Sequence, residues 1–319
     1  MPIIRTVLGD IEANKLGACY MHEHLLGHPP ANLSEPDLVL DSEQAAIREM
    51  NWFKEAGGRS LVEMSTPDYG RNATGLQRVS QASGVHIISA TGYNKEKFSA
   101  PFLQNAGVDE LAERFIREVQ VGMDGTGIRA GVIKASSSLN SLSPLAEKLF
   151  RAAARAHLAT GAPVSTHTEA GTMALEQVEL LASEGVRPER VIIGHMDRRL
   201  DWDYHLKLVE TGAYLGFDQL SKEKYFPDRQ RIDFIQRLIE AGYGKQIVLS
   251  GDLARRSYLP GYGTGGGPGF TYILWRFIPW LREAGVSQAA IEDLILHNPA
   301  RALSFCPHIS STTADHREP

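Results

Sequence analysis

Cysteine is scarce in this chain, because its 319 residues contain only Cys19 and Cys306. So few thiols exclude a disulfide-rich secreted scaffold and favour a reducing compartment. No apolar run approaches the ~20 residues that a membrane helix requires. The first residues also lack the basic segment and apolar core of a secretory signal. We therefore expect a cytoplasmic protein with no membrane partner.

Charge of one sign is not concentrated anywhere along the chain. Lysine and arginine number 33 against 38 aspartate and glutamate residues, which gives a net charge of −5. A protein that binds nucleic acid usually carries a clustered basic stripe, so no nucleic-acid partner is predicted. Hydrophobic residues make up 43% of the chain, which is typical of soluble globular proteins. A chain of this length can bury a large core.

Short apolar runs rich in β-forming residues alternate with stretches of helical periodicity. Eight candidate strands lie at 18–25, 60–66, 85–92, 129–136, 163–168, 190–197, 213–218 and 246–252. The helical stretches include 41–56, 108–120, 144–160 and 232–241. Strands that alternate with helices predict a parallel sheet. Eight such units match the usual size of a (β/α)8 TIM barrel.

The alternative to a barrel is an open, doubly wound sheet. In its dinucleotide-binding form, this sheet carries a glycine-rich turn after the first strand. The chain has His22-Glu23-His24 at that position. We therefore predict an α/β protein with a (β/α)8 TIM barrel over residues 1–308. The polar residues 309–319 are expected to form a flexible tail.

Imidazole and carboxylate side chains recur where the candidate strands end. The first strand ends in His22-Glu23-His24, and side chains two residues apart share a face, so both imidazoles can point inward. His167, His195 and Asp252 end the fifth, sixth and eighth strands. Active sites of barrels lie at these carboxyl ends. The convergence predicts a divalent metal site.

Lys134 lies inside the apolar run Gly131-Val132-Ile133-Lys134-Ala135. A buried ammonium group is costly, so the side chain could extend out of the barrel mouth instead. Alternatively, burial lowers the pKa of the amine. The neutral amine could then react with CO₂ to form a carbamate that bridges two metals. The residues by themselves leave both interpretations open.

Taken together, these motifs resemble the phosphotriesterase family of the amidohydrolase superfamily from residue 9 to about residue 303. The motifs that carry the resemblance are His22-Glu23-His24, Gly131-Val132-Ile133-Lys134, Thr166-His167-Thr168, Ile193-Gly194-His195-Met196-Asp197 and Ser250-Gly251-Asp252. Residues 297–301 resemble the closing helix of the family, with Asn298 as its N-cap.

The resemblance implies a centre of two divalent metal ions. His22, His24 and Asp252 would hold the first ion, and His167 and His195 the second. Lys134, carboxylated on its side-chain nitrogen, would bridge them. Zinc is the expected metal, with manganese, cobalt and iron as alternatives.

The resemblance also implies hydrolysis, in which a hydroxide shared by both metals attacks a carbonyl or phosphoryl centre. Asp252 would carry the proton towards the leaving group. Lys224, Arg255 and Tyr258 resemble the set that grips phosphate in the branch that opens phosphorylated sugar lactones. A guanidinium, an ammonium and a phenol suit such an anion. Tyr93 is expected to lean over the metals, and Lys95 to add an anion contact.

Three functions follow from these interpretations. The first is a lactonase that opens a small anionic, phosphorylated sugar lactone. The second is a phosphotriesterase-like esterase, or an amidase that acts on N-acylated small acids. The third is a non-catalytic binding protein, which the complete set of metal ligands disfavours. A homodimer is the default expectation for assembly.

Overall fold

A computed structural model describes residues 2–30, 33, 35–263 and 266–305. The predicted tail at 309–319 lies outside these residues. Eight parallel strands follow one another around a nearly closed barrel in the order of the chain, from β3 to β10. The strands are β3 (Cys19–Glu23), β4 (Ser60–Glu63), β5 (His86–Gly92), β6 (Val132–Ser136), β7 (Val164–His167), β8 (Val191–Ile193), β9 (Tyr214–Phe217) and β10 (Ile247–Leu249). The predicted TIM barrel is confirmed.

The first and last barrel strands meet at their carboxyl ends. The main-chain N–H of His22 donates to Ser250 Oγ at 2.9 Å. The main-chain N–H of Asp252 donates to the His22 carbonyl at 3.0 Å. The seam of the barrel therefore lies beside the residues that were predicted to bind metal.

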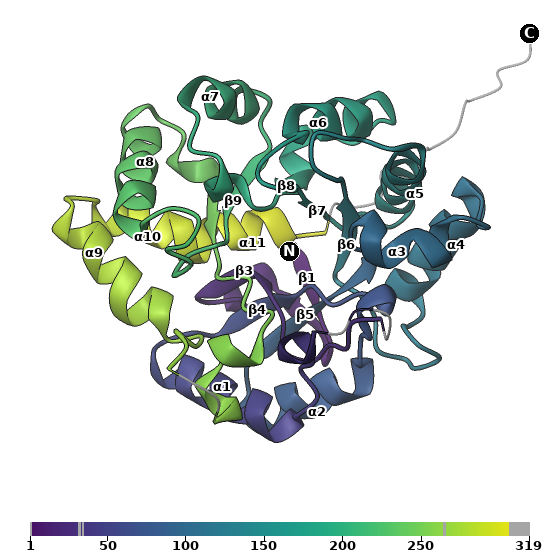
Figure 1. The fold of residues 1–319 in the computed structure, drawn as a ribbon, viewed down its shortest axis with the longest axis horizontal. Helices are drawn as coiled ribbons and strands as arrows, with labels where there is room; N and C mark the ends of the chain where they lie inside the picture. Colours follow the sequence, from purple (N-terminus) through teal and green to yellow (C-terminus); the bar gives the residue numbers. More distant parts are fainter. Residues whose placement is uncertain (1, 31–32, 34, 264–265, 306–319) are drawn as a thin grey trace, which may run out of the picture.

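Helices surround the strands, which lie at the centre of Figure 1. They are α1 (Glu43–Glu55), α2 (Ala73–Ser83), α3 (Glu96–Leu103), α4 (Val108–Gln120), α5 (Pro144–Thr160), α6 (Ala174–Ser183), α7 (Trp202–Glu210), α8 (Asp228–Glu240), α9 (Ile278–Glu283), α10 (Gln288–Glu292) and α11 (Asn298–Leu303). Local signals explain the limits of α5, because Ser143 accepts from the Ala146 N–H, Pro144 starts the first turn and Gly161 ends the helix at φ 75°. Helix α8 begins at Asp228 rather than at the predicted Ile232.

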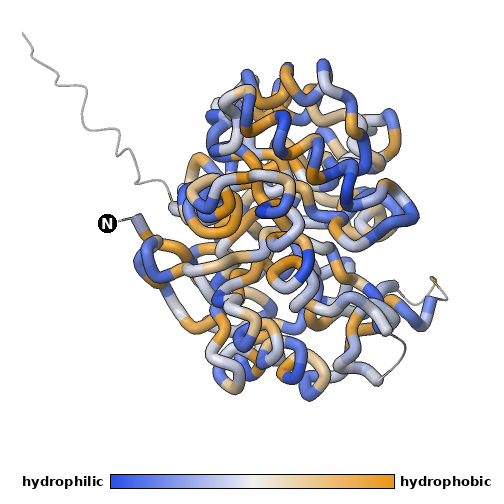
Figure 2. Tube along the Cα trace, turned by 90° about the vertical axis from the view of Figure 1, so that its left-hand side faces the viewer, coloured by the Kyte–Doolittle hydropathy of each residue, from blue (hydrophilic) through white to orange (hydrophobic). Residues whose placement is uncertain are grey.

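The barrel strands are buried on both faces. Ile87 belongs to the core between strands and helices, whereas Ile88 belongs to a second cluster inside the barrel. The antiparallel hairpin of β1 (Ile3–Thr6) and β2 (Gly9–Glu12) adds Ile4 to this inner cluster, and α11 adds Leu303. Hydrophobic and hydrophilic stretches consequently alternate along the chain in Figure 2. The amino-terminal end of the barrel is thus filled with apolar side chains.

Asn298 does not cap the closing helix, so that expectation is wrong. A π-helical turn, Asp293–His297, runs directly into α11, and His297 itself has helical backbone angles. The Asn298 side chain is fully buried and donates to the Gly244 carbonyl at 2.8 Å and the Ile247 carbonyl at 2.6 Å. Its amide therefore ties α11 to the start of β10.

Among the residues that the structure describes, every helix is too short or too polar to cross a bilayer. The cytoplasmic location and the homodimer stay predictions.

Candidate active site

His22 on β3 and His24 directly after this strand both face the barrel cavity, although strict alternation along the strand would not place them there. Cys19 and Met21 belong to the inner cluster, so an unbroken strand would turn Glu23 inward and His22 outward. The register between β3 and β4 shifts between Tyr20 and Glu23. As a result, His22 and His24 both line the cavity.

The Glu23 carboxylate is fully buried and holds the segment that follows β10. It accepts from Ser250 Oγ at 2.7 Å, from the Gly251 N–H at 2.6 Å and from the Leu253 N–H at 2.9 Å. Burial raises the pKa of Glu23 to about 7, against the effect of these hydrogen bonds. The contacts fix the chain on both sides of Asp252.

His195 and Asp252 lie beyond their strands, because β8 ends at Ile193 and β10 at Leu249. Both residues have a left-handed backbone, with φ 62° at His195 and 46° at Asp252. Such angles are uncommon outside glycine and gather at functional sites. The left-handed turn ends the strand pairing and directs each side chain into the cavity.

His22, His24 and Asp252 form one group of candidate ligands. Asp252 Oδ1 lies 3.3 Å from His24 Nε2 and 3.9 Å from His22 Nε2. One ligand atom from each of the three lies within 4.8 Å of the others. His24 Nδ1 contacts Ser65 Oγ at 2.9 Å, which leaves Nε2 towards Asp252. Two imidazoles and a carboxylate are a suitable donor set for a divalent ion.

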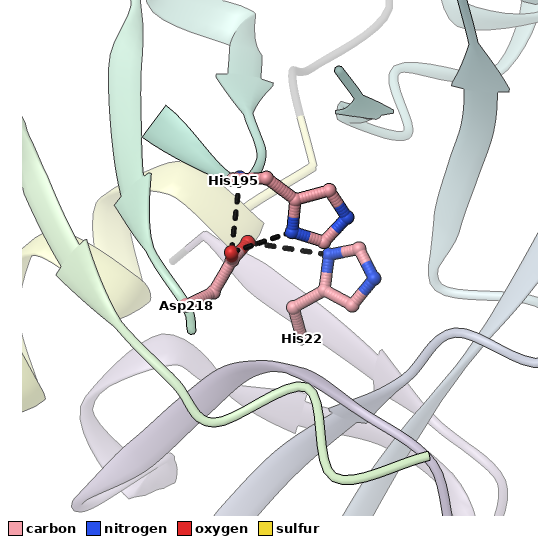
Figure 3. A group of neighbouring side chains, drawn as sticks. All are labelled: His22, His195 and Asp218. Carbon is pink, nitrogen blue, oxygen red and sulfur yellow. Dashed lines mark hydrogen bonds and ion pairs between the residues drawn. The ribbon is translucent and has the colours of Figure 1, made fainter. Parts of the chain in front are cut away.

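His167 at the end of β7 contacts His195 just beyond β8, and His195 Nε2 lies 2.7 Å from His167 Nδ1. Behind them stands Asp218, whose Oδ1 contacts His195 Nδ1 at 2.7 Å and whose Oδ2 lies 3.4 Å from His22 Nδ1 (Figure 3). The Asp218 carboxylate contacts Nδ1 of His195, which orients this ring and turns its Nε2 towards His167 and the cavity. These three residues, His22, His195 and Asp218, also form a second candidate ligand group.

Asp218 was missed by the sequence reasoning, although a usable signal was present. It ends the candidate strand 213–218, just as Asp252 ends the candidate strand 246–252. The rule that catalytic side chains gather at strand ends applies to both residues.

Lys134 is 1% exposed, and its Nζ donates to the Met64 carbonyl at 3.0 Å. It therefore does not extend out of the barrel mouth. Burial lowers the pKa of Lys134 to about 8, which makes the neutral amine more available. Burial of Lys134 inside the cavity favours the carbamate interpretation, which stays a prediction.

Burial also keeps the candidate imidazole ligands neutral. It lowers the pKa of His167 to about 3 and of His195 to about 4, and it lowers the pKa values of His22 and His24 as well. A metal requires the unprotonated imidazole, so these rings are in the ligand form at neutral pH. Burial alone would raise the pKa of Asp252, but the charge of Lys222 and the hydrogen bond to His24 contribute to holding it well below its usual value.

Gln219 and Lys222 contact the other oxygen of Asp252. Gln219 Nε2 donates to Asp252 Oδ2 at 2.7 Å, and Lys222 Nζ donates to the same atom at 3.0 Å. Lys222 also donates to the Asp252 carbonyl at 2.6 Å. Oδ1 is thereby left towards the histidines. Sequence reasoning missed both residues. Gln219 and Lys222 lie in a polar loop, and the local sequence does not show that Lys222 points to Asp252 and Lys224 to Tyr258.

These side chains line one cavity of about 230 Å³. Its wall carries more lysine and arginine than carboxylate side chains, with Lys95, Lys97, Lys134, Arg198, Lys222, Lys224 and Arg255 set against Glu35, Glu169 and Asp252. Tyr258 and all the predicted metal ligands also line it. The structure therefore brings together every predicted site residue except Tyr93.

The predicted anion contacts differ in their partners. Arg255 pairs with Glu35 at 3.0 Å and Asp37 at 3.5 Å, and Lys95 pairs with Glu169 at 2.6 Å. Lys224 Nζ instead donates to the neutral hydroxyl of Tyr258 at 3.0 Å, which raises the pKa of Lys224.

Tyr93 does not lean over the candidate metal ligands, so this expectation is corrected. Its ring packs between Phe102 and Phe115, with centroids 5.4 and 5.8 Å away, and the Arg114 guanidinium lies 5.5 Å from its centroid. Along β5, Ile88 and Ala90 point into the barrel, so odd-numbered positions point towards the helices. Tyr93 follows this parity and joins the helix-facing core.

Comparison with known proteins agrees with this geometry. The sequence profile of the phosphotriesterase family matches residues 2–303. The chain is 34% identical to a phospho-furanose lactonase of Mycoplasmopsis synoviae, with 94% of this chain and 91% of the relative covered. It is 33% identical to an N-acetyltaurine hydrolase of Dictyostelium discoideum, with 84% and 75% covered. The crystal structure of a lactonase from Listeria monocytogenes superposes with a TM-score of 0.91 at 36% identity, with 96% of this chain and 100% of that chain covered.

Proposed function

This chain belongs to the phosphotriesterase family, and from that premise we propose that it hydrolyses a small, phosphorylated sugar lactone. One cavity is lined both by the His22, His24 and Asp252 ligand group and by the Lys224–Tyr258 pair at its rim. This combination carries the proposal, because the Lys224 ammonium group, whose partner is the Tyr258 hydroxyl, can bind an anion beside the candidate metal ligands. The similarity to a phospho-furanose lactonase supports the substrate class.

The donor set fits two divalent ions. His22, His24 and Asp252 would hold one ion, His167 and His195 the other, and carboxylated Lys134 would lie between them. When bound, such ions polarise the lactone carbonyl and lower the pKa of water. Zinc is the expected metal, with manganese, cobalt and iron as alternatives.

Asp252 is the proposed proton carrier. Its Oδ2 is held by Gln219 and Lys222, so the carboxylate cannot turn freely. It takes the proton of the attacking water and delivers it to the ring oxygen as the bond between this oxygen and the carbonyl carbon breaks. Water is added across the ester bond, and the product is an open hydroxy acid.

Lys224, Tyr258 and Arg255 are the proposed phosphate contacts. Among the residues that the structure describes, Lys224 pairs with the Tyr258 hydroxyl and with no carboxylate, so a phosphate that binds this ammonium group displaces no anion. A phosphate that binds Arg255 competes with Glu35 and Asp37. Lys95, which pairs with Glu169, is a further and weaker contact.

The proposal is tested with metal-loaded protein on three substrates: a phosphorylated furanose lactone, the same lactone without phosphate, and N-acetyltaurine. Acid release from the lactones is followed with a pH indicator and taurine release with an amine reagent. The hydrogen bonds from Lys224 and Tyr258 to a phosphate are charge-assisted and contribute about 1.5–3 kcal/mol each, so we expect kcat/KM to be at least about 100-fold higher with phosphate than without it.

Equal rates on the two lactones would overturn the phosphate assignment. Faster release of taurine than of any hydroxy acid would instead support the amidase alternative, which the relative from Dictyostelium discoideum represents.

A further inference from the structure

The loop between β9 and α8, residues 218–227, supplies much of the cavity wall. Gln219, Lys222, Lys224 and Tyr225 all line the cavity from this loop. Next to the loop lies a buried ionic cluster, which consists of Arg231, Asp197 and Asp228. The proposed reaction uses none of these three side chains. Charged groups are rarely buried unless they are paired, so a buried cluster of three calls for an explanation.

Arg231 connects the cluster to the middle and to the end of the loop. Its guanidinium is fully buried and donates to Asp197 at 2.9 Å and to Asp228 at 2.7 Å. It also donates to the carbonyls of Phe226 and Lys222. A planar guanidinium has five donors in a fixed geometry, so it can hold these groups in one arrangement.

The two aspartates bind the main chain of the same loop. Asp197 accepts from the Gln219 N–H at 3.0 Å. Asp228 accepts from the Ser221 N–H at 3.0 Å and from the Tyr272 hydroxyl at 2.8 Å. The cluster thus joins the segment after His195, the β9–α8 loop and the segment that contains Tyr272.

The loop is held in a strained conformation at its centre. Ser221 has φ 75°, which is unfavourable for a residue with a Cβ atom. Such a residue persists when surrounding contacts over-determine its position. Here the contact is the hydrogen bond from the Ser221 N–H to the Asp228 carboxylate. It fixes the backbone directly before Lys222, whose side chain contacts Asp252.

We propose that the Arg231 cluster is a positioning device for the β9–α8 loop. It places Lys224 beside Tyr258 and thereby sets the preference for an anionic substrate. This substrate role rests on the proposed function. Arg231 is a positioning residue, since it contacts the loop and not the substrate.

Tyr272→Phe is the first test, because it removes one hydrogen bond to Asp228 and keeps the ring. Tyr204→Phe is the matched control, since its hydroxyl accepts from the Ala174 N–H. In each metal-loaded protein, kcat/KM is measured for the phosphorylated and the unphosphorylated lactone. Their ratio does not depend on the fraction of active protein. Amide hydrogen exchange of residues 219–227 is measured alongside.

We expect Tyr272→Phe to lower the substrate ratio about fivefold, mainly through a higher KM for the phosphorylated lactone, as the loss of one hydrogen bond implies. Exchange should become faster in residues 219–227, and the control should leave both readouts unchanged. Arg231→Lys should have a larger effect in the same direction, provided that it folds.

An equal loss on both substrates with unchanged exchange in Tyr272→Phe would overturn the inference, because the cluster would then be merely structural. If the wild-type ratio is near one, the proposed function fails and the substrate role fails with it. Exchange then still decides the positioning role: faster exchange in Tyr272→Phe alone supports it, and equal exchange in both variants overturns it.

Discussion

The two ends of the barrel use the same strands for opposite purposes. On β6, Val132 packs in the apolar cluster at the amino-terminal end, and Lys134 follows on the same face within the cavity. On β10, Val248 packs in the same cluster, and Asp252 lies beyond the carboxyl end of the strand. A residue that stabilises the barrel and a candidate reactive residue are therefore only two residues apart on β6 and four residues apart at β10.

This contrast has an energetic basis. Apolar burial at the amino-terminal end stabilises the fold by about 25 cal/mol per Å². The carboxyl end instead buries charged groups and contains residues with a left-handed backbone conformation, and both features cost free energy. Substitutions at the carboxyl end should therefore mainly change activity, and those at the amino-terminal end should mainly change stability.

The largest expected effect is at the carboxyl end. Asp252→Asn should lower kcat roughly 10³-fold, because the amide cannot carry the proton and is a poorer metal ligand. Steady-state kinetics on folded, metal-loaded protein measure this. Asp233→Asn is the matched control, since Asp233 is exposed on α8 and should keep wild-type activity. An Asp252→Asn enzyme within tenfold of wild type would refute the proposed role.

The amino-terminal end should show the reverse behaviour. Ile192 is 3% exposed in the inner cluster, so Ile192→Ala should lower the free energy of unfolding by about 2–5 kcal/mol. Urea unfolding measures this. Leu158→Ala, at a position that is 53% exposed, should cost less than about 0.5 kcal/mol. If kcat/KM per folded molecule falls more than about twofold in Ile192→Ala, the two ends are not separable.

A smaller effect distinguishes two cations at the rim. Lys224→Ala should raise KM for a phosphorylated lactone about tenfold, through the loss of a charge-assisted hydrogen bond. Arg255→Ala should raise it only about threefold, because Arg255 already pairs with Glu35 and Asp37. Steady-state KM values decide the order, and Lys207→Ala, at an exposed position of α7, is the control. The reverse order would show that Arg255 leaves its carboxylates when substrate binds.

The smallest effect concerns a buried histidine away from the cavity. His205 packs against Phe217 and Phe234, and burial lowers its pKa to about 4. The unfolded chain binds this proton first as the pH falls below about 6.5, so stability is lost between pH 6.5 and 4. Relative to His205→Leu, the wild type should lose about 1 kcal/mol between pH 7 and 5.5 in urea unfolding. Parallel curves for the two proteins would contradict this.

His205 also shows that burial and a low pKa do not by themselves mark a ligand. His195 has the same pKa direction, yet it lies beside His167 and Asp218 in the cavity. The two histidines differ in their neighbours, because only His195 lies beside other possible metal ligands at the carboxyl ends of the strands. The strand-end rule applied to the sequence captured that difference for His195 and left His205 aside.

The errors of the sequence reasoning share one cause. Tyr93 was assigned by its place in the chain, but the strand parity of β5 turns its ring towards the helices. Asn298 was assigned by its residue type, but a π-helical turn continues through its expected cap position. Both depend on a backbone path that the local sequence does not specify.

The rim residues Lys224, Arg255 and Tyr258 were assigned by resemblance to the phosphotriesterase family. Local signals were sufficient for the alternation of strands and helices and for the histidines and Asp252 at the strand ends. These properties follow from residue type and periodicity over a few positions, so they can be read along the chain. The partners of those residues could not be read in this way. Glu35 reaches Arg255, Gln219 reaches Asp252, and Arg231 reaches Asp197 only because the closed barrel brings distant segments together. The charge that each side chain can offer to a substrate therefore depends on the tertiary structure.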